Sequence, residues 1–331
     1  MNNLVREITN HCNLSCIHCS RDKKEKRIHM PYEMVEDIVR QAAALGIEEV
    51  CLTGGEPLLY PRLLDVLELF FSKGINVSIV SNGYLFKEIL YPFFKRKPSY
   101  IEMFSICFSV DGNTAEIHDF LRGKEGSFNR VMEAIRLCHE LDIPLSIKMA
   151  IWKYNIDHIL DACLFALEHA SEVGLIVLTP TPNLIKNDLI PSPKEYEEVI
   201  WKIKRKLIPF FSGVEIEGIC DVDSPVPLCN PFFSGPNIDY VGNVCFCCNL
   251  SNTVMANKKG DFFLGNINST SLDELFYKHL LKCSEFIRLM AKKAPNLWIR
   301  SCIYCSKIFG QMDWLKKIDS EWRNVIWNLP S

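Results

Sequence analysis

Three cysteines lie close together near the start of the chain, in the run CNLSCIHC. Three residues separate Cys12 from Cys16, and two separate Cys16 from Cys19. Three thiolates on one short loop can hold three corners of an iron–sulfur cube, and no fourth cysteine follows at similar spacing. Asp22 is the nearest candidate beyond, and a carboxylate is a poor ligand for a soft metal. One iron would stay open to bind a molecule that is not protein, as a metal site that does chemistry requires. A zinc loop or three unrelated thiols are the simpler alternatives.

Other polar motifs come directly after predicted strands. In chain order they are Gly54-Gly55-Glu56-Pro57, Ser81-Asn82-Gly83 and Ser109-Val110-Asp111-Gly112. Each would also serve as an ordinary turn. Because barrel enzymes place their sites at the carboxyl ends of the strands, we expect these motifs to share one pocket with the cysteine loop.

The last third of the chain adds a second group of metal-ligand candidates. They are Cys229, Cys247, Cys302 and Cys305. Four cysteines suit a structural zinc ion or an iron–sulfur cluster, and the spacing alone does not decide between them. Cys245 and Cys248 flank Cys247, so the choice among these three stays open.

The C-x3-C-x2-C triplet followed by GGEP resembles the cluster loop of the radical S-adenosylmethionine (radical SAM) enzymes. In that family the open iron of a 4Fe–4S cluster binds the amino and carboxylate groups of S-adenosyl-L-methionine. One electron from the cluster then cleaves this cofactor to methionine and a 5′-deoxyadenosyl radical. The resemblance implies that Cys12, Cys16 and Cys19 hold the catalytic cluster. The residue before the third cysteine is usually aromatic in the family, and His18 stands there in this chain.

The resemblance also implies a cofactor pocket. The GGEP backbone and glutamate bind the cofactor's ammonium group in the family, where a carboxylate suits a cation and glycines allow close backbone approach. Ser109 and Asp111, two apart on a strand, point the same way and would take the ribose hydroxyls. The implied cofactor-binding residues are His18, Gly54, Gly55, Glu56, Ser81, Asn82, Ser109, Asp111, Arg122 and Lys148.

Two of these residues rest on further observations. Arg122 belongs to the run HDFLRG, which looks like the HDxxRG segment of radical SAM enzymes with C-terminal cysteine extensions. Its guanidinium could meet the cofactor carboxylate or Asp111. Lys148 lies in an otherwise apolar strand, so we expect its charge to point to a cavity or to a partner.

The C-terminal segments GNVCFC and LGNI resemble those of the SPASM/twitch extension of the family. The twitch version holds one auxiliary 4Fe–4S cluster on four cysteines. The resemblance therefore favours one auxiliary cluster over zinc. Such a cluster could accept an electron from the substrate radical, relay electrons, or only hold the fold.

Apolar runs alternate with amphipathic segments in a strand–helix–strand rhythm. The strands are predicted at 4–9, 47–53, 76–81, 104–110, 145–151 and 173–179, and the helices at 31–45, 61–73, 84–96, 128–141 and 156–170. Six such units predict an α/β fold, a partial (β/α)6 TIM-like barrel. A helix at 193–208, a hairpin over 237–248, a strand at 262–267 and helices at 271–290 and 310–327 are predicted beyond it. We therefore expect a barrel over 1–185, a linker and helix over 186–218, and a small cysteine-rich α+β domain with a C-terminal helix over 219–331.

Composition limits the partners and the compartment. The formal net charge is −3 over 331 residues, so no bulk field recruits nucleic acid or an anionic membrane. The start of the chain is too polar for a secretory signal, and no apolar run is long enough to cross a bilayer. Fifteen cysteines, several clustered, indicate metal binding in a reducing compartment rather than disulfides. We expect a cytoplasmic enzyme, and the resemblance implies a flavodoxin- or ferredoxin-type electron donor.

The substrate is the least determined part of the prediction. Relatives with this extension mostly modify ribosomally made peptides or proteins by oxidation, cross-linking or epimerisation. This chain shows no peptide-recognition domain before Cys12, which weakens the peptide hypothesis without removing it, because a separate protein could bind the leader peptide. The alternative substrate is a small molecule such as an amino sugar, an aminocyclitol or a cofactor precursor. A non-catalytic iron–sulfur or zinc regulator is a second alternative, and the GGEP and SVDG motifs speak against it.

Overall fold

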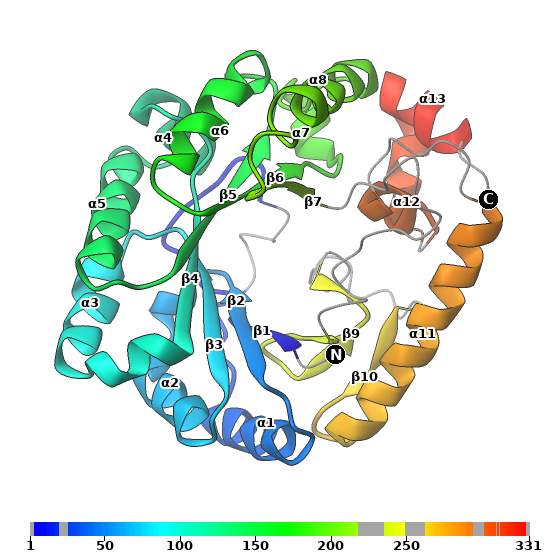
Figure 1. Ribbon diagram of the computed structural model, residues 1–331. Helices are drawn as coiled ribbons and strands as arrows, with labels where there is room; N and C mark the ends of the chain where they lie inside the picture. The colour runs from blue at the N-terminus through cyan, green and yellow to red at the C-terminus, as the bar shows by residue number, and fades with distance from the viewer. Residues whose placement is uncertain are drawn as a thin grey trace.

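The computed structural model describes residues 3–19, 26–217, 235–248, 262–293, 301–308, 310 and 312–328. Its described strands form one sheet in the order β10-β9-β8-β1-β2-β3-β4-β5-β6-β7. The parallel strands β1 to β7 are Asn3–Thr9, Glu49–Gly54, Asn76–Ser81, Phe104–Ser109, Leu145–Ile151, Glu172–Val177 and Val214–Glu217. The predicted partial barrel is confirmed, with helices around the outside of the curved sheet (Figure 1).

The helices before β7 follow the predicted rhythm, with two additions, at 115–122 and 182–186. They are α1 Tyr32–Ala44, α2 Leu63–Ser72, α3 Phe86–Arg96, α4 Ala115–Arg122, α5 Ser127–Glu140, α6 Ile159–Leu167, α7 Pro182–Lys186 and α8 Pro193–Lys206. Helix α4 was not predicted, although its signals are present in the sequence. The Thr114 side chain accepts a hydrogen bond from the Ile117 amide at its start, and Gly123 ends it in the left-handed region at φ 63°.

A strand also appears where a linker was expected. Strand β7 pairs with β6 and forms one end of the described sheet. The strand lies inside the segment 186–218, which the sequence assigned to a linker and a helix. The second predicted domain boundary falls between residues 218 and 219, outside the described residues, so the division into domains stays a prediction.

The C-terminal elements continue the barrel sheet. They are β8 Asn237–Ile238, β9 Asn243–Cys245, β10 Phe263–Asn266, α11 Leu272–Lys293, α12 Ser301–Ile308 and α13 Glu321–Asn328. Strand β8 pairs parallel with β1 and antiparallel with β9, which confirms the hairpin predicted over 237–248, and β9 also pairs antiparallel with β10. Gln41 on α1 accepts a hydrogen bond from the Leu272 amide at 2.7 Å, which ties α11 to the barrel beside α1 (Figure 1). The Trp322 indole nitrogen likewise donates to the Pro191 carbonyl at 3.0 Å.

The single helix predicted over residues 310–327 is wrong. The segment contains a 3-10 turn at Asp313–Lys317 and then the separate helix α13. Ile318 is extended between them, with φ −112° and ψ 128°. Ser320 then starts the second helix, because its hydroxyl accepts from the Arg323 amide as an N-terminal cap does.

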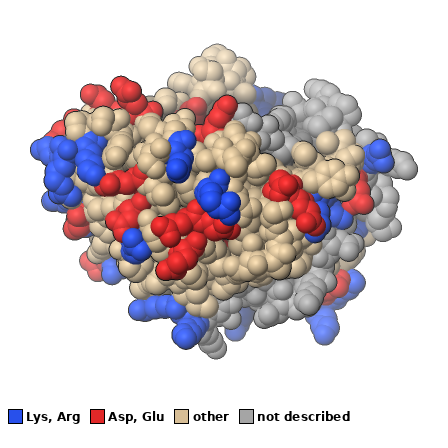
Figure 2. Space-filling view, turned by 90° about the horizontal axis from the view of Figure 1, so that it is seen from below, with Lys and Arg blue, Asp and Glu red and all other residues tan. Residues whose placement is uncertain are grey.

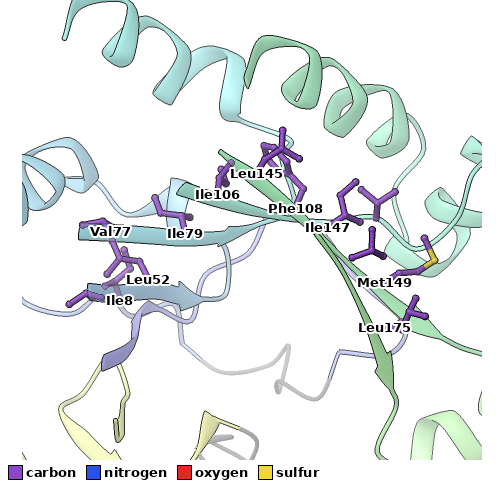
Figure 3. Packing of buried hydrophobic residues seen from close by; sticks show 14 of the residues in the cluster. Ile8, Leu52, Val77, Ile79, Ile106, Phe108, Leu145, Ile147, Met149 and Leu175 are labelled. Carbon is purple, nitrogen blue, oxygen red and sulfur yellow. The ribbon is translucent and has the colours of Figure 1, made fainter. Parts of the chain in front are cut away.

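The two faces of the parallel sheet differ in chemistry. Side chains at alternate positions, such as Leu145, Ile147 and Met149 on β5, are buried in one apolar cluster with residues of neighbouring strands (Figure 3). The intervening positions on β5, Ser146 and Lys148, are partly exposed. We call this second side the inner face. Its polar side chains make the inside of the barrel suited to a polar occupant.

The outer surface carries charges of both signs. On the face shown in Figure 2, lysines and arginines are interspersed with aspartates and glutamates. This face therefore presents no extended field of one sign to a partner. No helix among the described residues is long and apolar enough to span a membrane.

Arg6 is an exception within the apolar cluster. Its side chain is fully buried, its guanidinium lies 5.8 Å from the Phe70 ring, and none of its three side-chain nitrogens has a hydrogen-bond partner in the described part of the chain. Burial lowers the pKa of Arg6 to about 9. A buried cation without a partner carries a desolvation cost that an apolar side chain would avoid.

We therefore expect Arg6→Met to raise the free energy of unfolding by about 2 kcal/mol, because it removes the uncompensated charge. Urea unfolding followed by circular dichroism measures the change. Leu4→Met, on the same face of the same strand, is the control and should cost less than about 1.5 kcal/mol. A destabilised Arg6→Met protein would mean that the guanidinium has a stabilising partner.

Candidate active site

Apart from Lys148, which lies in the middle of β5, the sequence-predicted site residues of the barrel gather at the carboxyl ends of its strands. The cysteine loop follows β1, GGEP follows β2, Asn82 follows β3 and Asp111 follows β4. Since β1 to β4 are parallel neighbours, these four segments meet at one edge of the sheet. The shared pocket expected from the sequence has its framework here.

Two glycines bring the cysteine loop against the end of β2. A Cβ atom on Gly54 would lie 2.3 Å from the Thr9 carbonyl oxygen, and one on Gly55 would lie 2.2 Å from the His11 carbonyl oxygen. The Gly55 amide donates to the Thr9 carbonyl, and the Glu56 amide donates to the His11 carbonyl, both at 2.7 Å. The close approach that the sequence assigned to the cofactor is therefore made by the chain's own loop.

The three sulfurs differ in exposure and in their neighbours. Cys16 is buried, Cys12 is partly buried and Cys19 is exposed. The Arg122 Nη1 atom lies 3.8 Å from the Cys16 sulfur, and the Asn82 Nδ2 atom lies 4.0 Å from the Cys12 sulfur. Burial raises the pKa of Cys12 to about 11, so metal binding must release its proton. N–H donors facing the sulfurs suit thiolates that carry charge in a cluster.

The three thiols fit the corners of an iron–sulfur cube, in which each thiolate binds its own iron. The free thiols of Cys12, Cys16 and Cys19 are therefore compatible with an iron–sulfur cluster.

Glu56 holds neighbouring segments together. Its carboxylate accepts hydrogen bonds from the Leu58 amide, the Ser81 hydroxyl and the Asn82 amide, at 3.1, 2.8 and 2.8 Å. Burial raises the pKa of Glu56, and these hydrogen bonds oppose the rise. Ser81 is used in the same contact and also accepts from the Gly83 amide. Both residues thus form the wall of the site, and a direct role toward a cofactor stays a prediction for them.

Asn82 connects this wall to the cysteine loop. Its Nδ2 atom donates to the Asn13 side-chain oxygen at 2.9 Å, and its Oδ1 atom accepts from the Tyr84 amide at 3.0 Å. Asn13, within the cysteine run, was not singled out from the sequence. The only signal for it was its position between two predicted ligands.

Each polar letter of the HDxxRG run has a structural partner. His118 Nδ1 accepts from the Asp111 amide at 3.2 Å, and Asp119 accepts from the Ser127 hydroxyl and the Gly126 and Phe128 amides at the start of α5. Burial, followed by the charge of Arg122, lowers the pKa of His118 to about 4, so the ring is neutral. A Cβ on Gly123 would lie 2.6 Å from the Ser15 carbonyl oxygen. The HDxxRG segment therefore packs directly against the cysteine loop.

Arg122 and Asp111 form a buried ion pair. Arg122 Nη2 lies 2.6 Å from Asp111 Oδ2, and Asp111 Oδ1 accepts from the Ala150 amide at 2.8 Å. Burial alone would raise the pKa of Asp111, but the charge of Arg122 holds it below its usual value. Of the two partners expected for Arg122, the structure shows Asp111. Both Asp111 oxygens are engaged by the protein, whereas Ser109 is partly exposed.

Lys148 forms an ion pair, as expected for a charged side chain in an otherwise apolar strand. Its Nζ atom lies 2.6 Å from Glu217 Oε1 on β7, across Gly174 of β6. Burial alone would lower the pKa of Lys148, but Glu217 raises it above the usual value. Lys148 also lines a cavity of about 250 Å³ with residues of β5, β6 and the start of β7. Its lining includes Ser146, Glu172 and Gly213 at the amino ends of these strands, away from the cysteine edge.

The second cysteine group is described only in part. Cys229 lies outside the described residues, and so does the side chain of Cys305, although its backbone belongs to α12. Cys247 and Cys302 are partly buried, and Cys245 is buried in the hairpin. Cys248 exposes much of its surface, yet burial of its thiol, followed by the charge of nearby Cys302, raises the pKa of that thiol to about 11. The proximity to Cys302 favours Cys248 as a candidate beside the predicted Cys247.

The loop, its buried walls and the partial barrel define a metal-dependent enzyme domain with three thiols at the carboxyl edge of its sheet. Residues 7–166 match the family model described as Radical SAM superfamily. The chain therefore carries a radical SAM domain, as the sequence motifs predicted. The match ends in α6 and includes the cysteine loop and every motif as far as Lys148.

The curated proteins that are similar to this chain are named for several different activities. The chain is 28% identical over 202 residues to the AdoMet-dependent heme synthase of Methanosarcina barkeri, covering 59% of this chain and 55% of that protein. It is 30% identical over 181 residues to the sporulation killing factor maturation protein SkfB of Bacillus subtilis, covering 52% and 40%. A probable GTP 3′,8-cyclase of Pyrococcus horikoshii is 28% identical over 218 residues, covering 62% and 67%. The first two matches span about half the length of those proteins.

Solved structures share the fold. Streptococcus suis SuiB bound to S-adenosylmethionine aligns with a TM-score of 0.65 at 17% identity, over 83% of this chain and 65% of that one. Native anSMEcpe with bound AdoMet aligns with a TM-score of 0.66 at 18% identity, over 98% of this chain and 99% of that one. The likeness to anSMEcpe thus extends through the C-terminal elements as well as the barrel.

Gly55→Ala tests the contact that positions the loop. The new Cβ would clash with the His11 carbonyl, so we expect a loss of about 1–3 kcal/mol in unfolding free energy and loss of iron from the three-cysteine site. Iron per chain after anaerobic reconstitution is the measurement. Gly46→Ala is the control, since it meets no atom within 4 Å but has φ 67°; it should cost about 1–2 kcal/mol and keep its iron. Full iron in Gly55→Ala would contradict this role.

Proposed function

We propose that the chain is an enzyme that holds a 4Fe–4S cluster on Cys12, Cys16 and Cys19 and uses it to cleave S-adenosyl-L-methionine. The observation that carries the proposal is the position of these three free thiols at the sheet edge, against the GGEP and HDxxRG segments. The radical SAM domain over residues 7–166 supports it. When bound, cluster and cofactor would supply a radical able to take hydrogen from a substrate carbon.

The chain's own residues contribute by fixing this edge. Glu56 joins the ends of β2 and β3, Asn82 holds Asn13 of the cysteine loop, and Arg122 contacts Cys16. Groups held by several hydrogen bonds need little rearrangement when a ligand binds, which lowers the cost of binding. Ser109 and His18 keep some exposed surface and, together with the Gly54–Glu56 backbone, are the proposed direct contacts of the cofactor.

The proposed substrate is a ribosomally made peptide or a protein side chain. SkfB is a maturation protein for a sporulation killing factor, and another Bacillus subtilis relative is named for biosynthesis of the antilisterial bacteriocin subtilosin. SuiB has been solved with its precursor peptide SuiA. These names support a peptide substrate here, with a separate leader-peptide-binding protein as a further proposed partner.

A small polar molecule is the alternative substrate. The matches named heme synthase and GTP cyclase favour it, since those names give no peptide product. The inner face also offers hydroxyls and charges, among them Ser109, Ser146 and Lys148. A group that is itself polar or charged would suit these neighbours.

The C-terminal cysteines are proposed to hold one auxiliary 4Fe–4S cluster, with Cys229, Cys302, Cys305 and either Cys247 or Cys248 as ligands. The electrostatic effect of Cys302 on the Cys248 thiol supports it, because these two thiols then lie near each other. The proposed role is to accept an electron from the substrate radical. A flavodoxin- or ferredoxin-type protein would supply the electron that starts the reaction, which suits a cytoplasmic enzyme.

Formation of 5′-deoxyadenosine tests the central proposal. Wild-type protein, reconstituted anaerobically and incubated with S-adenosyl-L-methionine and dithionite, should release 5′-deoxyadenosine detectable by chromatography. Cys16→Ala should lower the rate at least about a hundredfold, since a ligand of the proposed catalytic cluster is lost. Cys138→Ala, which removes a buried thiol of α5, is the control and should retain the activity. Failure of the wild type to form 5′-deoxyadenosine under strong reduction would revive the regulator alternative.

Iron and sulfide analysis tests the auxiliary cluster. Wild type should bind roughly eight irons, and a protein with Cys12, Cys16 and Cys19 all changed to alanine should bind about four, from two cubane clusters and then one. A triple variant that binds no iron but one zinc would replace the auxiliary cluster with a structural zinc site. The cleavage proposal would survive that result.

The substrate class is tested by supplying both candidates to the reconstituted protein. Small peptides encoded beside the gene form one set, and aminocyclitols and amino sugars form the other. We expect 5′-deoxyadenosine to rise above the substrate-free level only with a peptide, accompanied by a peptide mass change such as the loss of two hydrogens. Turnover of an aminocyclitol or amino sugar instead would favour the alternative.

A further inference from the structure

Arg122 is a charged side chain that lies against a predicted cluster ligand. Its Nη1 atom lies 3.8 Å from the Cys16 sulfur, while its Nη2 atom lies 2.6 Å from Asp111 Oδ2. The Arg122 side chain is 9% exposed and that of Asp111 is 1% exposed. The guanidinium thus bridges a thiol and a carboxylate inside the protein, where solvent screens the charges weakly.

The bridge is held in place from both sides. The Asp111 carboxylate is fixed by the Ala150 amide, and its own amide donates to His118. Arg122 is the last residue of α4, and Gly123 after it packs against the Ser15 carbonyl of the cysteine loop. The Leu121 carbonyl, one residue earlier, accepts from the Ile17 amide at 2.9 Å. The guanidinium and the Cys16 sulfur are therefore held at a fixed relation by backbone contacts.

The three cysteine thiols have different surroundings. Cys16 faces a cation, Cys12 faces the neutral amide of Asn82, and Cys19 is exposed. A hydrogen bond or positive charge at a cluster sulfur stabilises the more negative, reduced state and so raises the reduction potential. The carboxylate of Asp111 contacts the other terminal nitrogen of Arg122 and opposes its charge.

We propose that the Arg122–Asp111 pair sets the reduction potential of the cluster on Cys12, Cys16 and Cys19, with Arg122 raising it and Asp111 limiting the rise. The inference rests on the proposed function, since it requires that cluster. The step concerned is uptake of one electron by the oxidised cluster from a low-potential donor of the flavodoxin or ferredoxin type. No bond is broken in this step, and the cluster with its thiolates becomes more negative by one charge. Arg122 acts as a positioning residue through Cys16.

The test is a redox titration followed by electron paramagnetic resonance of the reduced cluster, with dithionite as reductant. The signal that changes when S-adenosyl-L-methionine is added identifies the cluster with an open iron. Arg122→Met should lower the midpoint potential, leaving about tenfold less reduced cluster at a fixed potential, or about 59 mV for one electron. Arg122→Lys should recover part of the shift because it keeps the charge.

Asp111→Asn is the second variant, and its expected shift has the opposite sign. It leaves Arg122 beside Cys16 without the opposing carboxylate, so the midpoint potential should rise. Loss of a merely structural contact would not move the potential in opposite directions in the two variants. Arg130→Met is the matched control, because Arg130 pairs with Glu88 and the Tyr84 carbonyl on the outside of the barrel; its potential should equal that of wild type.

The possible outcomes distinguish a failure of this inference from a failure of the proposed function. An unchanged or raised potential in Arg122→Met overturns the inference, as does an unchanged or lowered potential in Asp111→Asn. If Arg122→Met fails to keep its cluster, the Asp111→Asn result alone decides. Absence of any signal that responds to S-adenosyl-L-methionine in the wild type overturns the proposed function instead.

Discussion

The site depends on one backbone contact, the approach of the Thr9–His11 segment to Gly54 and Gly55. Any side chain at either glycine would occupy the place of a carbonyl oxygen. Two hydrogen bonds of 2.7 Å close the contact. It turns the chain out of β1 so that the first cysteine stands at the edge of the sheet, where β2, β3 and β4 also end. The GGEP motif, which the resemblance assigns to cofactor binding, therefore also positions the cysteine loop.

Buried polar groups extend that framework without unpaired carboxylates. Glu56 receives three hydrogen bonds, and Asp111 receives an amide and a guanidinium. Removing one member of such a set would leave a buried group unsatisfied, which costs more than the net value of the hydrogen bond. These contacts are therefore mutually dependent, and the edge of the barrel behaves as one rigid unit. A rigid edge suits a site that must hold a reactive species away from the protein itself.

Most of the fold was predictable because its signals are local. The strands at 76–81 and 145–151 agree with β3 and β5 to the residue, since apolar runs bounded by turn residues leave little choice. The missed elements are short. Strand β7 is four residues long and gains its place from pairing with β6, which no local pattern reveals. Helix α4 was hidden because its residues were interpreted as a motif, although Thr114 and Gly123 mark both of its ends.

The sequence predicted which residues belong to the site, but much less of which residues contact one another. The motifs identified Glu56, Asp111 and Arg122, yet the contacts of these side chains with one another depend on which strands are neighbours. Lys148 shows the same division. A charge in an apolar strand required a partner, but Glu217 lies on a strand that was not predicted, and Gly174 makes room for the pair only because β6 runs between them.

The hydrogen-bond and ion-pair partners of the site residues also indicate which of these residues can turn to a ligand. A group already saturated by the protein gains little by turning to a ligand, because each new hydrogen bond replaces an old one of similar strength. Glu56 and Ser81 are in that position, whereas Asp111 pairs with one Arg122 nitrogen and the other Arg122 nitrogen is directed at the Cys16 sulfur. The charge of Arg122 is therefore divided between holding the wall and acting on the metal loop. A single guanidinium therefore joins Asp111 to the Cys16 sulfur, and the surroundings of that sulfur depend on what holds Arg122 in place.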